Sequence, residues 1–287
     1  MPRESDMETM KGDGLTLFFD AEERETARLV QDACEKSIRL MRERWGLDTP
    51  PEVRVYVMTS WRHFVFHSAP WYWQPLLALS LPFLYFRIKN LWRSAGGWAQ
   101  AYGKRRVIGV KPARLIQLAD RKLGDRIFVR EDTIDDTIRR ITCHELTHAF
   151  TSHLRLPMWL NEGLAVLAVD RLLGRPTVRT DTLDVVARSA SSKPIERVNT
   201  VTEKNQDAVV ALYIRGYWIA RYLEEVRPGL LESLLTRPRR HAELEGQIAN
   251  ALGMSREAFW NSIGGIVASH FGQPSTSGEQ LESDADN

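Results

Sequence analysis

Residues 133–154 read TIDDTIRRITCHELTHAFTSHL, and this stretch predicts a helix that carries the pattern H-E-x-x-H. Thr133 followed by Asp136 resembles a capping box, the arrangement with which many helices begin. Apolar residues then recur at approximately helical spacing, and no Pro or Gly interrupts the stretch. The sequence therefore predicts a helix of about 20 residues with the motif near its middle.

The pattern itself is formed by His144, Glu145 and His148. Residues four apart lie on the same face of a helix, so the two imidazoles can bind one metal ion. Glu145 can then reach a water molecule held at the open position of the metal. The alternative interpretation is a solvated helix face with two ordinary histidines, and the helical context argues against it.

A catalytic zinc ion usually has three protein ligands and a water, so a third ligand is required. In the metzincin pattern it is a histidine six residues after the second motif histidine. Leu154 occupies that position here, and Thr151 replaces the glycine of that pattern, so the sequence argues against this class. The nearest spare imidazole, His153, is interpreted as a cation near the carboxyl end of the helix, where the dipole favours positive charge.

Glu162 is the better candidate for the third ligand. Leu156-Pro157 ends the first helix, and residues 158–173 predict a second, largely buried one. A carboxylate inside an apolar helix is costly unless it is paired, protonated or bound to a metal. Asn161, beside it, is equally out of place in a plain core. The alternative is a glutamate that faces solvent where the second helix begins.

His144-Glu-Leu-Thr-His148 followed by Trp159-Leu-Asn-Glu-Gly-Leu-Ala165 resembles the gluzincin branch of zinc metallopeptidases, in particular the peptidase-MA-like families. In those families H-E-x-x-H is followed by W-x-x-E-G-x-A, and the match is specific over residues 133–170. The resemblance implies that His144, His148 and Glu162 bind one Zn²⁺. It also implies that Glu145 is the general base and acid of peptide-bond hydrolysis.

A looser similarity to the same families extends over residues 212–223, where related chains often have a helix with a tyrosine. It implies Tyr213 as the hydroxyl that stabilises the oxyanion, with Tyr217, one turn away, as the rival. Either residue could instead be an ordinary aromatic in a packed helix. Thermolysin-like enzymes often place Asp four residues after the ligand Glu. Val166 stands there, so the partner that orients a histidine is not identified.

The composition is ordinary for a globular protein, with 43% hydrophobic and 26% charged residues among 287. A net charge of +2 gives no reason to expect a nucleic-acid partner. Two cysteines, Cys34 and Cys143, are too few for a disulfide framework. Cys143 adjoins His144, but on a helix it points about 100° away, so it is interpreted as a small core residue.

The order of the predicted elements indicates an α+β fold. Short strands are expected at 15–19, 53–57 and 106–110, with a long amphipathic helix at 22–45. From Thr133 onward the chain is predicted to be almost entirely helical: 133–154, 158–173, 180–190, 206–226, 228–236, 239–251 and 255–270. We therefore expect a small N-terminal mixed sheet with a long helix, followed by a mainly helical, zincin-like catalytic part.

One domain is expected over residues 14–271, between a flexible N-terminus at 1–13 and a disordered tail at 272–287. The gluzincin resemblance also implies that an edge strand forms one wall of the active-site cleft and pairs with an extended peptide. Residues 106–110 are our choice for that wall.

An aromatic and hydrophobic insertion is expected at 61–95. Residues 64–86 have no formally charged side chain, if His67 is neutral, but three prolines interrupt the 23-residue stretch. Tryptophan and tyrosine cluster there as they do at membrane interfaces. The segment could contact a membrane peripherally, pack over its own domain or bind a partner. A transmembrane crossing is disfavoured, because a strand of the domain precedes the segment and the motif helix follows it.

The primary expectation is therefore zinc-dependent hydrolysis of a peptide or protein substrate, with Glu145 as general base. The alternative is a non-catalytic binding or membrane-surface module on a metallopeptidase scaffold. The intact Glu145 favours catalysis, because a structural metal site does not need it. No cleavable signal is visible in the polar N-terminal residues, so the expected location is the cytoplasm, with peripheral contact to the membrane.

Overall fold

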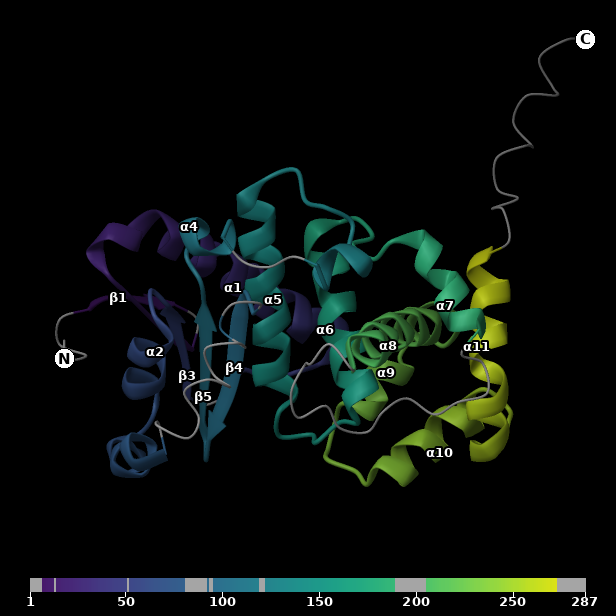
Figure 1. The fold of residues 1–287 in the computed structure, drawn as a ribbon. Coiled ribbons are helices and arrows are strands. Elements are labelled where there is room, and N and C mark those ends of the chain that lie inside the picture. Colours follow the sequence, from purple (N-terminus) through teal and green to yellow (C-terminus); the bar gives the residue numbers. More distant parts are fainter. Residues whose placement is uncertain are drawn as a thin grey trace, which may run out of the picture.

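The computed structural model describes residues 7–12, 14–50, 52–80, 92, 95–118, 122–188 and 205–272. A five-stranded mixed sheet lies at the N-terminal end of the molecule, and a bundle of helices lies beside it (Figure 1). The predicted α+β class is confirmed, with the sheet first in the chain and helices after it. The predicted tail at 272–287 lies almost entirely outside the described residues.

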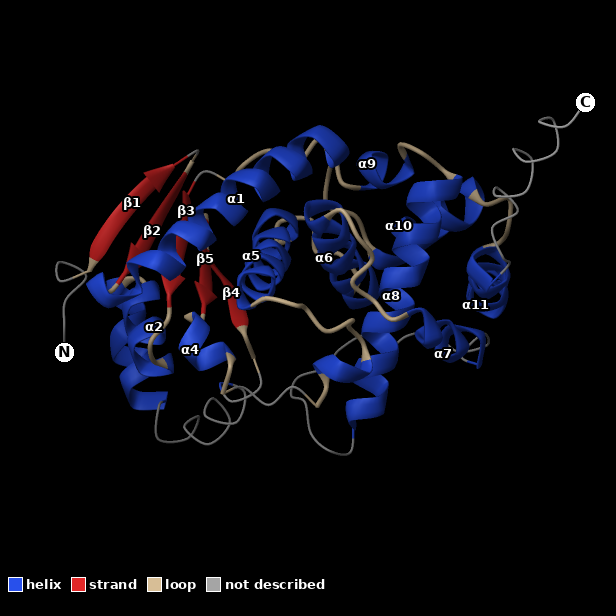
Figure 2. Ribbon diagram, turned by 90° about the horizontal axis from the view of Figure 1, so that it is seen from above, coloured by secondary structure: helices blue, strands red, loops and turns tan. Residues whose placement is uncertain are grey.

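The sheet has the strand order β1-β2-β3-β5-β4. Its two central pairs, β2 with β3 and β3 with β5, are parallel, and its two outer pairs are antiparallel. Figure 2 shows β4 as the strand nearest the helical part. The strands are β1 (Glu8–Gly12), β2 (Leu15–Phe19), β3 (Glu52–Val57), β4 (Gly97–Tyr102) and β5 (Arg105–Val110).

Helices cover both faces of the sheet. Val53, Val55 and Val57 of β3 lie in the main core with residues of α1 (Arg24–Trp45) and α5 (Ile134–Thr151). Alternate residues on the opposite face, such as Tyr56, form a smaller core with Phe64 of α2 (Trp61–Ser68). This alternation follows from the two-residue repeat of a strand.

Helix α1 and the helices from Thr133 onward agree closely with the sequence prediction, whereas α2 and α4 (Ala113–Ile116) were not predicted. Thr133 caps α5, because its side-chain oxygen accepts a hydrogen bond of 3.1 Å from the backbone N–H of Asp136. The other helices are α6 (Met158–Leu173), α7 (Leu183–Arg188), α8 (Gln206–Val226), α9 (Leu230–Leu234), α10 (His241–Ala251) and α11 (Arg256–Gly272). Short 3₁₀ turns are η2 (Ala21–Glu23), η3 (Trp71–Trp73), η4 (Gly124–Arg126) and η5 (Thr180–Thr182).

Helices α6 and α8 approach each other through two glycines. A Cβ atom added to Gly163 would lie 2.2 Å from the backbone oxygen of Gly216. One added to Gly216 would lie 2.1 Å from the backbone oxygen of Trp159. Side-chain atoms do not approach backbone oxygens so closely, so this crossing requires glycine in both helices.

Three expectations about the sheet require correction. Residues 8–12, expected to belong to a flexible N-terminus, form β1 and pair with β2. Strand β4 was not predicted and lies just after the expected insertion. The strand at 106–110 exists as β5, but it lies between β3 and β4, so β4 is the edge strand.

The expected insertion at 61–95 is not uniform. Phe64 in α2 is buried against the sheet, so this part packs internally. Residues 71–79 are mostly exposed, and residues 81–91 lie outside the described part of the chain. Within the described residues, none of the helices combines the length and the apolar character that a membrane crossing requires.

Candidate metal centre

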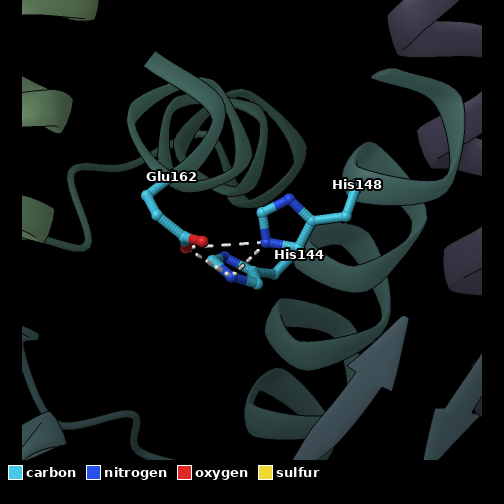
Figure 3. A group of neighbouring side chains, drawn as sticks. All are labelled: His144, His148 and Glu162. Atoms are coloured by element: carbon cyan, nitrogen blue, oxygen red, sulfur yellow. Dashed lines mark hydrogen bonds and ion pairs between the residues drawn. The ribbon is translucent and has the colours of Figure 1, made fainter. Parts of the chain in front are cut away.

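Three side chains converge between α5 and α6 (Figure 3). Helix α5 contributes His144 and His148, which lie one turn apart, and α6 contributes Glu162. The Nε2 atoms of the two histidines are 3.1 Å apart. Oε2 of Glu162 lies 3.4 Å from Nε2 of His144 and 3.5 Å from Nε2 of His148. The structure thus brings together all three predicted ligands.

These distances fit one small cation. Zinc binds histidine nitrogen and carboxylate oxygen at about 2.0–2.2 Å, and in a tetrahedron the ligand atoms are then about 3.3–3.6 Å apart. The triangle of His144, His148 and Glu162 has nearly these edges. Oε2 of Glu162 is buried, and among the described residues no hydrogen bond of good geometry reaches it. A cation would satisfy this oxygen.

The three side chains are not sealed from solvent. The exposed fractions of the His144, His148 and Glu162 side chains are 15%, 16% and 14%. A metal held by three protein ligands at a partly exposed position retains room for water or substrate, which is typical of catalytic sites.

The charges within the site favour a cation at its centre. Burial raises the pKa of Glu162, but His148 and His144 outweigh it and hold this pKa well below its usual range. Burial lowers the pKa of His148, but the neighbouring Glu162 has the opposite effect and raises this pKa to about 9. The buried carboxylate therefore stabilises positive charge on the imidazole of His148, and a divalent cation can supply that charge instead.

Asn161 holds His148 from behind. Its Nδ2 lies 2.9 Å from Nδ1 of His148, and its Oδ1 lies 2.9 Å from the hydroxyl of Thr151, which also contacts the backbone oxygen of Thr147. A histidine that binds metal through Nε2 carries its proton on Nδ1 and needs an acceptor there. A 180° turn of the Asn161 amide supplies it: the carbonyl oxygen then faces His148, and the amide nitrogen donates to the hydroxyl of Thr151. In the sequence, Asn161 stands out only as a polar residue in an apolar helix, and no role could be predicted for it.

Glu145 lies against the edge strand. A Cβ atom added to Gly97, the first residue of β4, would lie 2.6 Å from Cγ of Glu145 and 2.7 Å from Cγ2 of Ile141. Only a residue without a side chain allows the strand so close to the motif helix. Burial raises the pKa of Glu145, although His144 and His148 lower it in part. The carboxyl group therefore sits between the ligand triangle and β4.

The two candidate tyrosines occupy different environments. The Tyr213 ring is parallel to the His144 ring, with 6.2 Å between centroids. Burial, followed by Glu162 and Glu145, raises the pKa of Tyr213 well above its usual value, so its hydroxyl stays protonated. Tyr217 instead donates a hydrogen bond of 2.6 Å to the buried Asp170. Of the two, Tyr213 is therefore the one at the site.

The remaining residues singled out from the sequence lie apart from the triangle. Nδ1 of His153 contacts the backbone oxygen of Phe150 near the end of α5, at 2.9 Å. Leu154 is buried in the core, as are Cys143 and Val166. Within the described residues, the only group of three or more His, Cys, Asp and Glu side chains arranged to hold a metal is His144, His148 and Glu162.

Compared with known proteins, the chain matches no family model and no curated protein sequence. The arrangement of its own residues is therefore the basis of any functional assignment.

Proposed function

We propose that this protein is a zinc-dependent peptidase in which His144, His148 and Glu162 bind one Zn²⁺. The observation that carries the proposal is the triangle of their Nε2 and Oε2 atoms, with edges of 3.1–3.5 Å. A zinc ion there would polarise the scissile carbonyl group and lower the pKa of a bound water. The adjacent Glu145 distinguishes this site from a purely structural one.

The proposed roles of the protein side chains follow from their positions. Glu145 accepts a proton from the attacking water and returns it to the leaving nitrogen. Its burial keeps the pKa above the usual carboxylate value, which makes it a better base than an exposed glutamate. The protonated hydroxyl of Tyr213 donates a hydrogen bond to the developing oxyanion. Asn161 keeps His148 in the orientation that directs Nε2 into the site.

Strand β4 is suited to bind the substrate backbone. It ends the order of described strands, so its outer edge has unpaired backbone N–H and C=O groups. An extended peptide can add to such an edge as a further strand. Because Gly97 touches Glu145, a peptide bound there would pass close to the proposed base.

Metal analysis of the purified protein is the first test. We expect about one zinc ion per chain, and loss of hydrolysis on chelation with recovery on adding zinc. Glu162→Ala removes the only anionic ligand and should weaken zinc binding by at least about a hundredfold. His153→Ala, which alters a histidine outside the triangle, is the matched control and should bind zinc normally. Equal zinc affinity in wild type and Glu162→Ala would contradict the assigned ligand set.

A second test concerns the oxyanion donor. Tyr213→Phe removes only the hydroxyl and should lower kcat about 10²–10³-fold, the usual effect of removing one such donor. Zinc content should stay unchanged. Tyr217→Phe is the matched control: it loses the bond to Asp170, so it should reduce stability while the folded enzyme keeps its kcat. If the two variants had the same kcat, Tyr213 would not be the donor.

A non-catalytic module is the competing function. Zinc binding at full stoichiometry with no cleavage anywhere in a diverse peptide library would favour it. The presence of Glu145 beside the ligand triangle and β4 supports catalysis instead.

A further inference from the structure

An exposed aromatic segment at residues 71–79 has no role in the proposed chemistry. The exposed fractions are 80% for Trp71, 59% for Tyr72, 54% for Leu76 and 73% for Leu79. Seven large apolar side chains are exposed in the described part of the chain, and five of them, Trp73 included, belong to this segment. Such a concentration on the surface of a protein indicates a binding site rather than chance exposure.

The shape and composition of the aromatic segment suit a lipid bilayer. Trp71 and Leu79, the two most exposed side chains of the segment, protrude from the surface. Residues 71–80 have no charged side chain, and tryptophan and tyrosine are the residues enriched where hydrocarbon meets headgroups. Leu76 and Leu79, three apart in the helical residues 74–80, share one face that could enter the hydrocarbon.

The sequence around the aromatic segment is rich in Lys and Arg, of which Arg54 and Arg105 pair with Glu52 and Arg114 pairs with Glu23. Residues 53–119 contain ten Lys and Arg and no Asp or Glu, although the whole chain carries only +2. Exposed Lys104 lies in the turn between β4 and β5, directly after Tyr102 and Gly103. Basic side chains beside an apolar surface attract anionic lipid headgroups.

A chain of contacts connects the aromatic segment to the candidate metal centre. The ring of Trp73 lies 6.4 Å, between centroids, from that of Tyr102, the last residue of β4. At the other end of β4, Gly97 touches Glu145. Five steps along a strand span about 17 Å. In Figure 1 the segment follows α2 at the lower left, on the side towards which β4 runs.

We propose that the aromatic segment and the turn that carries Lys104 dock on an anionic lipid bilayer, and that the substrates are membrane-anchored proteins. The substrate part of this inference rests on the proposed peptidase function. A polypeptide leaving the bilayer could pair with β4 and reach Glu145 about 17 Å, or five residues, from the surface. Cleavage would then occur in the juxtamembrane part of the substrate.

Vesicle binding tests the docking surface without requiring catalysis. We expect the full-length chain to sediment with vesicles of equal parts phosphatidylglycerol and phosphatidylcholine, and less with phosphatidylcholine alone. The double variant Trp71→Ser/Leu79→Ser should lower the partition coefficient at least about tenfold, because both side chains would enter the apolar layer. Lys104→Glu should weaken binding only to the anionic vesicles.

The controls separate lipid binding from other causes. Leu118→Ser alters an equally exposed leucine, 82% exposed, two residues after the end of α4. Figure 1 shows α4 at the end of the sheet opposite to the aromatic segment. It should bind vesicles as wild type does, and so should His144→Ala. Failure of the wild type to bind anionic vesicles would overturn the proposal. Normal vesicle binding by the double variant would also overturn it. The same holds if the only effect of the double substitution is to dissociate a dimer of this chain.

Cleavage of a tethered peptide tests the substrate class. One peptide sequence is presented either on a lipid anchor in the same anionic vesicles or free in solution. The anchored form should be cleaved at least about tenfold faster by wild type, and this preference should vanish in Trp71→Ser/Leu79→Ser. Vesicle binding without any cleavage would refute the peptidase and leave the docking surface standing. Cleavage of both forms at equal rates would refute the membrane-anchored substrate class and leave the peptidase standing.

Discussion

Glu145→Gln should strongly reduce peptide hydrolysis while the protein still binds zinc. Glutamine has nearly the shape of glutamate but cannot accept the proton of the attacking water, so the variant loses general-base catalysis. Such catalysis contributes about 10²–10⁴-fold to rate, and kcat/KM should fall by a comparable factor. Helix packing should be preserved, because glutamine differs from glutamate in one polar atom and keeps the contact that Cγ makes with Gly97.

The measurement is kcat/KM on a cleaved peptide, paired with zinc content determined on the same preparation. His148→Ala is the companion variant, because it should lose zinc and activity together. The contrast between the two variants separates the base from the ligands. Full activity in Glu145→Gln would eliminate the proposed mechanism, whatever its zinc content.

Gly216→Ala should be strongly destabilising. The added methyl group would lie 2.1 Å from the backbone oxygen of Trp159 and 3.2 Å from the backbone nitrogen of Gly163. Both neighbours are backbone atoms, so no side-chain rotation can relieve the overlap, and α6 and α8 must separate. Overpacking a core typically costs about 1–3 kcal/mol, and we expect about 3 kcal/mol or more here. Chemical denaturation of the two proteins measures the difference.

The matched control is Gly265→Ala in α11. A Cβ atom there meets nothing within 4 Å, and the residue is exposed. Alanine is preferred over glycine within a helix by about 1 kcal/mol, so this variant should gain stability. If the two variants had equal free energies of unfolding, the close helix crossing would be disproved.

The separation of α6 and α8 in Gly216→Ala should also weaken zinc binding at the proposed site. Tyr213 lies one turn before Gly216 on α8, and Glu162 directly precedes Gly163 on α6. Any folded fraction of Gly216→Ala should therefore bind zinc less tightly than wild type, a loss that a purely local effect on α8 would not produce.

The helical half of the fold could be predicted from the sequence because its signals are local. Thr133 marks the start of α5, Pro157 precedes the start of α6, and the H-E-x-x-H spacing places both histidines on one face. The convergence of Glu162 with them was also expected, since a carboxylate in an apolar helix needs a partner.

The sheet was harder to predict because strand pairing is long-range. Strand β4 is rich in glycine and alanine, which have weak strand propensity, and β1 reads as a polar terminus. The apolar residues 106–110 predict a strand but do not indicate which strands lie beside it. Only the three-dimensional structure could show that β4 is the edge and that Gly97 reaches Glu145.

Within the site, the sequence indicated the three candidate metal ligands but not the residues that hold them in place. Asn161 was visible as a polar residue beside Glu162, yet its contact with His148 depends on how α5 and α6 pack. Likewise, the choice between Tyr213 and Tyr217 depends on which side of α8 faces α5 and which faces Asp170.

The helices that carry the ligands are anchored by apolar packing of their own. Leu146 and Phe150 of α5, and Leu160 and Leu164 of α6, are all completely buried in the main core. A zinc finger draws its folding free energy from the metal, but here hydrophobic burial supplies it. A zinc ion bound at the proposed site could therefore leave and return without unfolding the chain. Cellular zinc supply would then set how many molecules are active, while their number stays the same.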